Sequence, residues 1–556
     1  MGGFPRRSAP TEIKGNAIWQ PLMGDQQSIR VIDLFAGPGG LSEGFSSFET
    51  DGGHRPFRIG LSVEMEKDAH QTLKLRSFFR QFEKGHAPDK YYELLRRCDE
   101  PLSKRLQELF GAYPDEARNA IQEAWQAELG KEDPHLVHDK VAAALGNVDP
   151  WVLLGGPPCQ AYSIAGRSRN KGNPDYKPDE DKRLRLYVEY LQVIADHRPA
   201  AFVMENVKGL LSATVLEQKI FKRIVDDLKN PCAALLRENR CIQSRTDKPD
   251  PPEYQVFSLV RPTAPENGDL RDFAVHMERY GVPQARHRLI LLGVRKDILG
   301  SRRPSSLDSH DAVAAKDVLE CLPRLRAGLS KETDSPEAWR AWLRAAKERR
   351  WFAATLNKAG ETTYDQLVST VETLASPRND RGAEFVHWEP EIRYEPAWFI
   401  DERIGGVYNH STRAHIARDL YRYLYVACFG KAQDRSPVLA DFPADLLPDH
   451  RNVESALKGG TFEDRFRVQL ASRPSTTITC HIAKDGHYYI HYDPSQCRSL
   501  TVREAARLQT FPDNYFFCGP RTEQYTQVGN AVPPLLARQV AKIVWDVLRE
   551  SGAANR

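Results

Sequence analysis

Cys159 is the residue of this sequence that is best placed to act as a nucleophile. It follows an apolar run at 151–154 and the segment GGPP at 155–158. A short apolar run between turn formers predicts a buried parallel strand, and ligands of open α/β sheets bind beyond the carboxyl ends of such strands. The glycines let a ligand approach closely, and the prolines stiffen the segment. We therefore expect the thiol at a cleft, although a buried free thiol at a strand end would have the same local sequence.

Two further strand patterns end or begin at charged groups that could assist a nucleophile. Glu205 follows the apolar run 200–204, so its carboxylate would enter the same cleft as Cys159. The alternative is an ordinary surface acid. Arg288 opens the strand pattern 288–294, and Arg286 stands two positions before it. Side chains two positions apart on an extended segment share a face, so the two guanidinium groups could hold one acceptor together.

A nucleotide-type site is predicted near the start of the chain. A strand pattern at 28–35 leads into AGPGG at 36–40 and an amphipathic helix start, which is the strand, glycine turn and helix of a nucleotide site. A second strand, at 57–63, ends at Glu64, where an acid can hold two ribose hydroxyls. NAD and S-adenosylmethionine both fit this pattern. The glycine spacing departs from the dinucleotide GxGxxG form and favours the methyl donor.

The elements that must position these groups are interrupted twice. With 556 residues the chain is too long for one core, so we expect two or three domains. Residues 1–27 have no periodicity and predict a loose tail. Residues 68–148 have helical spacing and predict an insertion between two strands. Beyond residue 295 the alternation of strand and helix is lost for about 180 residues, which indicates a second domain.

Charge and cysteine usage limit the function classes. The 78 basic and 75 acidic residues give a net charge of +3, so affinity for a polyanion must come from local patches. One such patch is the segment 164–183, which predicts either a solvated loop or a lid that closes on phosphates. The nine cysteines are scattered without zinc-site spacing, so we expect no metal and a reduced intracellular setting. Neither a signal peptide nor a long apolar span is apparent, which predicts a soluble cytoplasmic protein.

Six motifs in a fixed order resemble those of the DNA (cytosine-5)-methyltransferases of bacterial type. They are DLFAGPGG at 33–40, GGPPCQAYS at 155–163, ENV at 205–207, QARHRLILLGVR at 284–295, RSLTVREAARLQTFP at 498–512 and QVGNAVPP at 527–534. The resemblance extends from residue 29 to about residue 545. It implies an α/β fold, with a Rossmann-like domain dependent on S-adenosylmethionine and a smaller, irregular α+β target-recognition domain. The implied division is 28–328 for the catalytic domain, with the insertion at about 68–148, 329–472 for target recognition, and 473–556 for a segment that returns to the catalytic domain.

The resemblance also implies roles for individual residues. Cys159 falls on the nucleophile, Glu205 on the acid that contacts nitrogen 3 of a flipped base, and Arg288, supported by Arg286, on the group that holds its carbonyl oxygen. The implied S-adenosylmethionine contacts are Phe35, Ala36, Gly37, Gly39, Gly40, Glu64, Met65, Pro158, Leu186, Asn530 and Val532. The implied DNA contacts are Ser163, Arg167, Arg169, Lys171 and Arg183.

Two departures from the family pattern concern the cofactor. Met65 stands where an aromatic residue often stacks on the adenine, although its side chain can still pack on a ring face. The acid usually found before the nucleophile strand cannot be placed across the helical insertion.

The partner implied is double-stranded DNA, bound by a monomer without membrane contact. A cognate restriction endonuclease that acts separately is compatible with this reading. Three alternatives stay open: a transfer-RNA methyltransferase of the same family, a catalytically inactive DNA-binding relative, and a nicotinamide oxidoreductase. The large segment after residue 295 favours an enzyme that recognises a sequence in duplex DNA over a transfer-RNA methyltransferase. The intact Cys159 and Glu205 argue against the second, and the cysteine segment is unexplained by the third.

Overall fold

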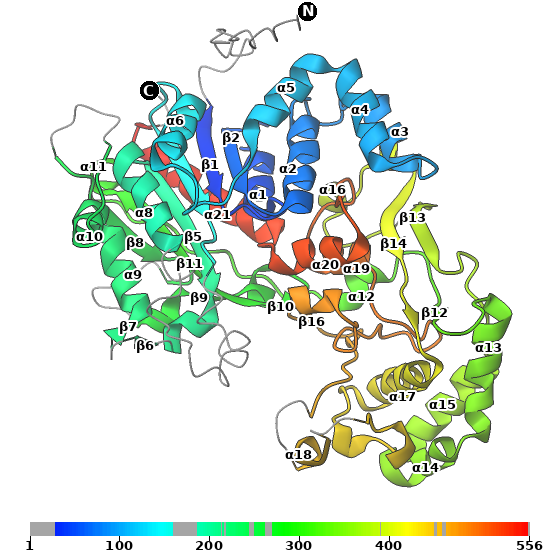
Figure 1. Ribbon diagram of the computed structural model, residues 1–556. Helices are drawn as coiled ribbons and strands as arrows, with labels where there is room; N and C mark the ends of the chain where they lie inside the picture. The colour runs from blue at the N-terminus through cyan, green and yellow to red at the C-terminus, as the bar shows by residue number, and fades with distance from the viewer. Residues whose placement is uncertain are drawn as a thin grey trace, which may run out of the picture.

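One mixed sheet organises the catalytic part of the molecule (Figure 1). A computed structural model describes residues 28–158, 186–212, 214–215, 218–243, 250–261, 269–389, 391–449, 453–458 and 463–553. The strand order is β3-β2-β1-β4-β5-β11-β8, with β9 paired to β11. The first five of these strands are parallel, and β11 is antiparallel to β5, β8 and β9. The Rossmann-like α/β fold predicted from the sequence is confirmed.

The sheet strands are the apolar runs of the sequence. They are β1 (Ile29–Leu34), β2 (Phe57–Glu64), β3 (Ala124–Gln126), β4 (Trp151–Gly155), β5 (Ala201–Val207), β8 (Tyr254–Ser258), β9 (Ala274–His276) and β11 (His287–Arg295). Every residue of β1 and β4 is buried, as expected for central parallel strands covered on both faces. Leu34 aligns with Val63 and with Gly155, and Gly155 aligns with Met204. The carboxyl ends of β1, β2, β4 and β5 therefore meet at one edge of the sheet.

Helices cover both faces of this sheet (Figure 1). One face carries α1 (Gly40–Ser47) and α21 (Pro534–Glu550), and the other carries α6 (Pro134–Leu145), α8 (Leu186–His197), α9 (Ile220–Lys229) and α10 (Pro231–Arg237). The pair α1 and α21 packs so closely that a Cβ on Gly44 would lie 2.3 Å from the Cβ of Ala537. Glycine at this position thus permits the contact.

The predicted helical insertion contains one strand that the sequence pattern did not indicate. Its helices are α2 (Lys67–Arg80), α3 (Asp89–Arg96), α4 (Leu102–Ala112), α5 (Pro114–Glu123) and α6. Between α5 and α6, the three residues of β3 pair in parallel with Ser62–Glu64 at the edge of the sheet. A three-residue strand gives too few alternating positions for a periodicity argument to detect.

A second body of helices and short strands lies beyond the sheet, at the lower right in Figure 1. It comprises α13 (Pro336–Arg344), α14 (Arg350–Ala359), α15 (Glu361–Glu372), α17 (Ala417–Gln433), α18 (Val453–Leu457), β12 (Gly328–Leu329) and β15 (Ala414–His415). The antiparallel pair β13 (Gly382–His387) and β14 (Gly406–Ser411) packs instead among residues of the insertion and of the segment after residue 499. The core of the second body is built around Trp339, Trp351 and Leu424, and it also includes Ile490 and Cys497. The boundaries 329–472 stay a prediction.

The chain then returns to the sheet through α19 (Val502–Leu508), α20 (Arg521–Asn530) and α21. The remaining short elements are α11 (Lys296–Leu299), α12 (Ala315–Leu319), α16 (Pro396–Phe399), β6 (Thr214–Val215), β7 (Gln218–Lys219), β10 (Gln284–Ala285) and β16 (Ser475–Thr476). Across the described ranges, the helices lack the length and apolar character that a bilayer crossing would need.

Candidate functional site at the carboxyl edge of the sheet

Glu205 and Arg288 form an ion pair at this edge. The Nε atom of Arg288 lies 3.1 Å from Oε1 of Glu205, and both side chains are mostly buried. Their strands are neighbours: Ile290 of β11 is opposite Glu205, and Arg288 is opposite Val207. Arg288 is therefore the diagonal neighbour of Glu205, a relationship in which long side chains on one sheet face can touch.

The backbone that leads to Cys159 is held beside this ion pair. A Cβ on Gly156 would lie 3.2 Å from Oε2 of Glu205, so the missing side chain lets this carboxylate approach the backbone. The amide of Asn206 donates a hydrogen bond to the carbonyl oxygen of Pro157 at 3.1 Å. Pro158 follows, half-buried, and Cys159 itself lies outside the described residues. The predicted acid and the approach to the predicted nucleophile thus share one location.

Arg286 and Arg288 bind different groups, contrary to the expectation of a shared acceptor. Arg286 is fully buried and donates to the carbonyl oxygens of Ile478, at 2.8 Å, and Gly529, at 3.2 Å. It lies in the break between β10 and β11, where the Arg286 amide donates to the carbonyl of Gln284. The alternation of a continuous strand therefore does not apply to the two arginines. Burial and the nearby charge of Arg288 lower the pKa of Arg286 well below its usual value.

The glycine turn after β1 is closed onto Glu64. The amide of Gly37 donates to Oε2 of Glu64 at 2.8 Å, and the amide of Glu66 donates to Oε1 at 2.8 Å. Phe35 and Gly37 both have left-handed backbone, with φ of 58° and 57°. A Cβ on Gly37 would meet nothing within 4 Å, so the turn faces open space there. A fixed carboxylate next to an open glycine turn suits a ligand with adjacent hydroxyls, and burial raises the pKa of Glu64.

The last motif forms the opposite wall of this turn. A Cβ on Gly40 would lie 2.1 Å from the carbonyl oxygen of Val532, so only glycine fits at this contact. Val532 is buried, whereas Asn530, at the end of α20, is exposed. The Tyr515 hydroxyl also donates a hydrogen bond to the carbonyl of Pro38. The C-terminal segment therefore shapes the turn that begins more than 470 residues earlier in the chain.

Asp33, at the end of β1 just before this turn, is a residue that the sequence prediction left out. Its side chain is completely buried at the end of β1 and accepts a hydrogen bond from the Ser42 hydroxyl at the start of α1. Burial raises the pKa of Asp33 to about 6. The available signal was an acid near the end of a mostly apolar strand pattern, immediately before the glycine turn.

Three further predicted cofactor contacts lie in different elements of the sheet domain. Met65 follows Glu64 and is 49% exposed, and its carbonyl accepts a hydrogen bond from the Gln126 amide at 3.3 Å. The unpredicted strand β3 thus contacts the residue predicted to pack on the adenine. Leu186 begins α8 and faces Gly130, whose Cβ would lie 3.1 Å from a Leu186 methyl carbon. Ala36 anchors the turn through its amide, which donates to the carbonyl of Val63.

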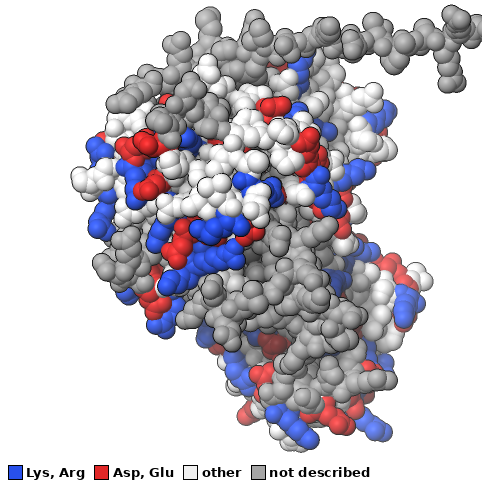
Figure 2. Space-filling view, turned by 60° about the vertical axis from the view of Figure 1, so that its left-hand side comes forward, with Lys and Arg blue, Asp and Glu red and all other residues white. Residues whose placement is uncertain are grey.

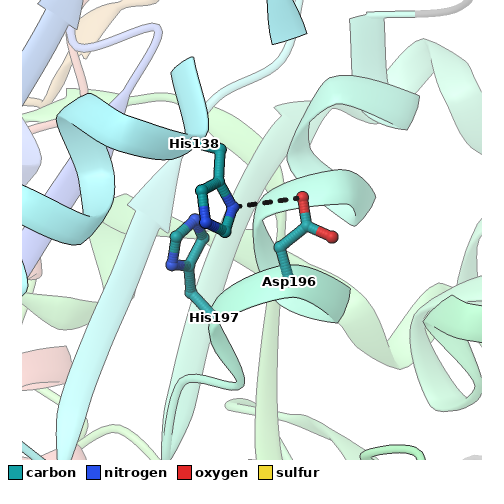
Figure 3. A group of neighbouring side chains, drawn as sticks. All are labelled: His138, Asp196 and His197. Carbon is teal, nitrogen blue, oxygen red and sulfur yellow. Dashed lines mark ion pairs between the residues drawn. The ribbon is translucent and has the colours of Figure 1, made fainter. Parts of the chain in front are cut away.

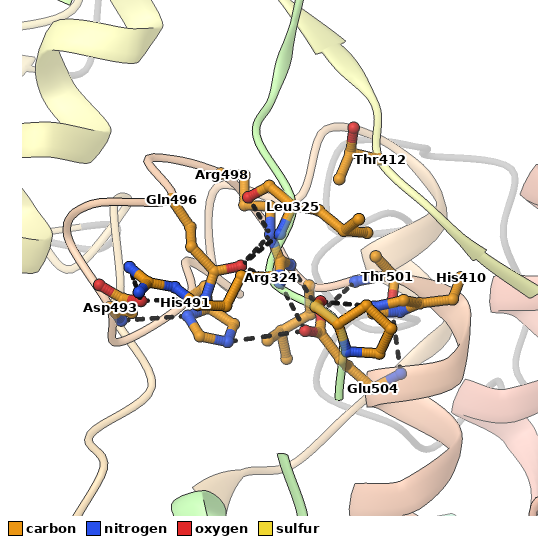
Figure 4. Close-up of polar contacts among 12 residues, drawn as sticks. Arg324, Leu325, His410, Thr412, His491, Asp493, Gln496, Arg498, Thr501 and Glu504 are labelled. Carbon is orange, nitrogen blue, oxygen red and sulfur yellow. Dashed lines mark hydrogen bonds and ion pairs between the residues drawn. The ribbon is translucent and has the colours of Figure 1, made fainter. Parts of the chain in front are cut away.

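A buried polar cluster joins the catalytic part to the second body (Figure 4). Arg498 binds both carboxylate oxygens of Glu504, at 2.7 and 2.6 Å, and the Gln496 side chain accepts from Arg498. His491 lies 3.6 Å from Glu504, and His410 hydrogen-bonds to Thr501 of the α19 cap at 2.8 Å. A cavity of about 530 Å³ borders this cluster but is lined by none of the predicted site residues.

The predicted DNA contacts Ser163, Arg167, Arg169, Lys171 and Arg183 lie outside the described residues. On the face shown in Figure 2, basic and acidic side chains are interspersed over the described surface. This distribution agrees with the nearly balanced charge of the whole chain.

The family model and the sequence relatives agree with one another. The family model described as C-5 cytosine-specific DNA methylase matches residues 113–231 and 274–545. The chain is 32% identical to the type II methyltransferase M.Bpa9945I of Bacillus paralicheniformis, over 93% of this chain and 99% of that protein. It is 26% identical to the DNA (cytosine-5-)-methyltransferase M.ApeKI of Aeropyrum pernix, over 73% of this chain and 83% of that protein. The solved structure of the methyltransferase EhMeth of Entamoeba histolytica is 11% identical and has a TM-score of 0.41, with 94% and 99% of the chains covered.

Proposed function

The chain belongs to the C-5 cytosine-specific DNA methylase family and is a DNA (cytosine-5-)-methyltransferase, and we propose that it uses S-adenosylmethionine to methylate a cytosine flipped out of double-stranded DNA. The proposed reaction passes through a covalent bond between Cys159 and the base. The observation that supports it best is the Glu205–Arg288 ion pair beside the backbone that leads to Cys159.

A nucleophile is needed because carbon 5 of cytosine does not react with a methyl donor unaided. The Cys159 thiolate adds to carbon 6, since thiolate is a strong nucleophile and later a good leaving group. The addition moves electron density toward nitrogen 3 and the carbonyl oxygen of the base. Glu205, which takes up a proton from solvent before the addition, donates that proton to nitrogen 3, and Arg288 stabilises the carbonyl oxygen. Because Arg288 has five N–H donors, it can bind the base while it keeps contact with Glu205.

The covalent bond to Cys159 must break again for turnover. Once carbon 5 carries the new methyl group, a base removes the proton from carbon 5. The electron pair of that C–H bond restores the double bond between carbons 5 and 6, and the C–S bond breaks to release the Cys159 thiolate. Nitrogen 3 loses its added proton, which leaves neutral 5-methylcytosine.

The glycine turn and Glu64 are suited to hold the cofactor. The carboxylate of Glu64 is fixed by the amides of Gly37 and Glu66, and the turn is open at Gly37. We assign the ribose hydroxyls to Glu64 and the walls of the site to Phe35, Gly40 and Val532. When bound, S-adenosylmethionine would supply the methyl group from its positively charged sulfonium: the sulfur–methyl bond breaks as the bond to carbon 5 forms, and neutral S-adenosylhomocysteine leaves.

Reaction at carbon 6 requires the base to leave the duplex, because that atom is stacked inside it. Flipping costs a few kcal/mol, which protein contacts to the DNA must offset. We assign the clamp to the basic segment 164–183 and the reading of the DNA sequence to residues 329–472. The type II naming of the relatives supports a separate restriction endonuclease as the biological partner. We expect the enzyme to act as a monomer in the cytoplasm.

The proposal is tested by trapping the covalent bond. Duplex DNA with 5-fluorocytosine at the target position should form a denaturant-stable adduct with the wild-type enzyme, because fluorine cannot be removed as a proton. Cys159→Ser should form none and still bind DNA. Cys98→Ser, which changes an exposed cysteine, is the matched control and should form the adduct normally.

The proposed mechanism would be overturned if the wild-type protein formed no adduct on 5-fluorocytosine versions of the DNA sequences that it methylates. A second arm with a transfer-RNA transcript separates the substrates. Methylation of the transcript in preference to duplex DNA would favour the RNA alternative.

A further inference from the structure

A second group of chemically competent side chains lies far from the predicted active site. His138 of α6, and Asp196 and His197 at the end of α8, gather where the insertion meets the sheet domain (Figure 3). One ligand-type atom from each of the three lies within 4.8 Å of the others. The Trp151 indole, at the start of β4, donates to the carbonyl of His197 at 3.0 Å. The group therefore lies at the amino edge of the sheet, opposite to Glu205.

The carboxylate of this group is buried with little to balance its charge. The Asp196 side chain is 5% exposed. Its salt-bridge partner within the described ranges is His138, whose Nδ1 lies 3.9 Å from Oδ2 of Asp196. That distance exceeds a hydrogen bond, and Nδ1 of His138 is buried without a hydrogen-bond partner among the described residues. A buried carboxylate is costly without a close countercharge, and a buried imidazole nitrogen is costly without a hydrogen-bond partner or another ligand.

The surroundings of Asp196 hold its carboxylate in one orientation. The Gln192 amide donates to both oxygens, at 3.1 and 3.0 Å, and the backbone amide of Gln243 donates to Oδ1 at 2.7 Å. These donors leave Oδ2 directed at His138, as the dashed line in Figure 3 shows. Outer hydrogen bonds of this kind are typical of carboxylates that bind a metal ion.

We propose that His138, Asp196 and His197 bind one divalent transition-metal ion, with Zn²⁺ as the best match to their chemistry. Two imidazoles and a carboxylate are common zinc ligands, at about 2.0–2.2 Å from the ion. Ligand atoms at those distances in a tetrahedron would be roughly 3.4 Å apart, so side-chain rotation alone brings His138 and Asp196 into place. His138 is partly exposed, which gives the ion an entry path and room for a water as fourth ligand. The ion would fasten α6 of the insertion to α8.

Sequence spacing could not indicate this site. Zinc motifs are recognised by ligands a few residues apart, whereas His138 of α6 and Asp196 of α8 are more than 50 positions apart in the sequence. Only the packing of α6 on α8 brings them together.

Metal content is the direct test. Protein stripped with a chelator, incubated with excess Zn²⁺ and desalted should retain one zinc per chain by mass spectrometry, and zinc should raise its melting temperature. His138→Ala should weaken zinc affinity by more than the roughly 10- to 100-fold that loss of an outer hydrogen-bonding group costs. His135→Ala, on the exposed first turn of the same helix, is the matched control and should bind like the wild type.

Two results would overturn the proposal. One is wild-type protein that retains no zinc, and the other is equal retention by His138→Ala and His135→Ala.

Because His276, Glu278 and His287 form another group with ligand-type atoms, the variant His276→Ala is tested as well. Loss of zinc in that variant alone would place the ion on β9 and β11 instead. His138→Gln, with circular dichroism, separates loss of a ligand from loss of folding. The readout is metal content, so the result is independent of the proposed methyl transfer.

Discussion

Arg288 reaches from β11 to Glu205 on β5 and places its Nε 3.1 Å from Oε1 of that carboxylate. The two residues come from strands more than 80 positions apart, and their contact depends on the antiparallel register that puts Ile290 opposite Glu205. A shift of one residue would turn Arg288 to the other face of the sheet. The pairing of β5 with β11 is therefore as important for the proposed chemistry as the residues themselves.

The two carboxylates at this edge should have separable roles. Glu205→Gln keeps the size and hydrogen bonding of the side chain but removes its transferable proton. General acid catalysis is typically worth about 10²- to 10⁴-fold in rate, so we expect a loss in that range in single-turnover methylation, with cofactor affinity nearly unchanged. Glu64→Gln should instead weaken cofactor binding, because Glu64 is the carboxylate fixed at the glycine turn. The opposite outcome for the two variants would reverse the assignment.

Gly40→Ala should damage the cofactor site through backbone contact. Its new methyl group would lie 2.1 Å from the carbonyl oxygen of Val532, so the turn and the last motif must separate. Overpacking of this kind typically costs about 1–3 kcal/mol, and we expect weaker cofactor binding with a lower melting temperature. Gly111→Ala, in α4, has open space at the same atom and serves as control. Equal behaviour of the two variants in calorimetry would argue against a tight Gly40–Val532 contact.

The buried polar cluster around Arg498 and Glu504 contains two histidines, and we expect these to make the stability of the folded protein sensitive to acid. Burial lowers the pKa of both His410 and His491 to about 4, whereas each would titrate near 6.5 in the unfolded chain. The unfolded chain then binds more protons between those values, so stability is present above about pH 6.5 and is lost as the pH falls toward 4. Each histidine contributes up to about 1.4 kcal/mol per pH unit in this window. Asp33, whose pKa is raised to about 6, acts in the opposite direction.

A variant isolates the contribution of one histidine from that of all other groups. His491→Asn keeps an acceptor for the Asp493 amide, which donates to Nδ1 of His491. Its urea midpoint should fall less steeply than that of the wild type between pH 7 and pH 5. His86→Asn, at an exposed position, should follow the wild type. Parallel curves for all three proteins would show that the His491 environment does not resist protonation.

Exchange of residues 330–470 for the equivalent segment of a relative should change the methylated sequence and leave the reaction unchanged. The physical reason is that most of the core of the second body lies in this segment, whereas Glu205, Arg288 and the glycine turn belong to the sheet domain. Bisulfite sequencing of host DNA gives the methylated site. A folded chimera that methylates the original site would locate recognition elsewhere in the chain.

The sequence by itself determined the strands that carry the chemistry. The runs before Phe35, Glu64, Cys159 and Glu205 are mostly apolar, as buried strands require, and glycines and prolines directly after the runs before Phe35 and Cys159 mark where those two strands end. Local composition and chain order are sufficient for these features, because burial and turn formation depend on neighbouring residues.

Contacts between distant segments were decided only by the tertiary structure. The acceptors of Arg286 are carbonyls of Ile478 and Gly529, and the strand β3 exists only because Ser62–Glu64 offers it an edge. The grouping of His138 with Asp196 depends in the same way on the packing of two helices. Such contacts arise from the register and packing of whole elements, and these are set by the summed burial of many residues rather than by any local pattern.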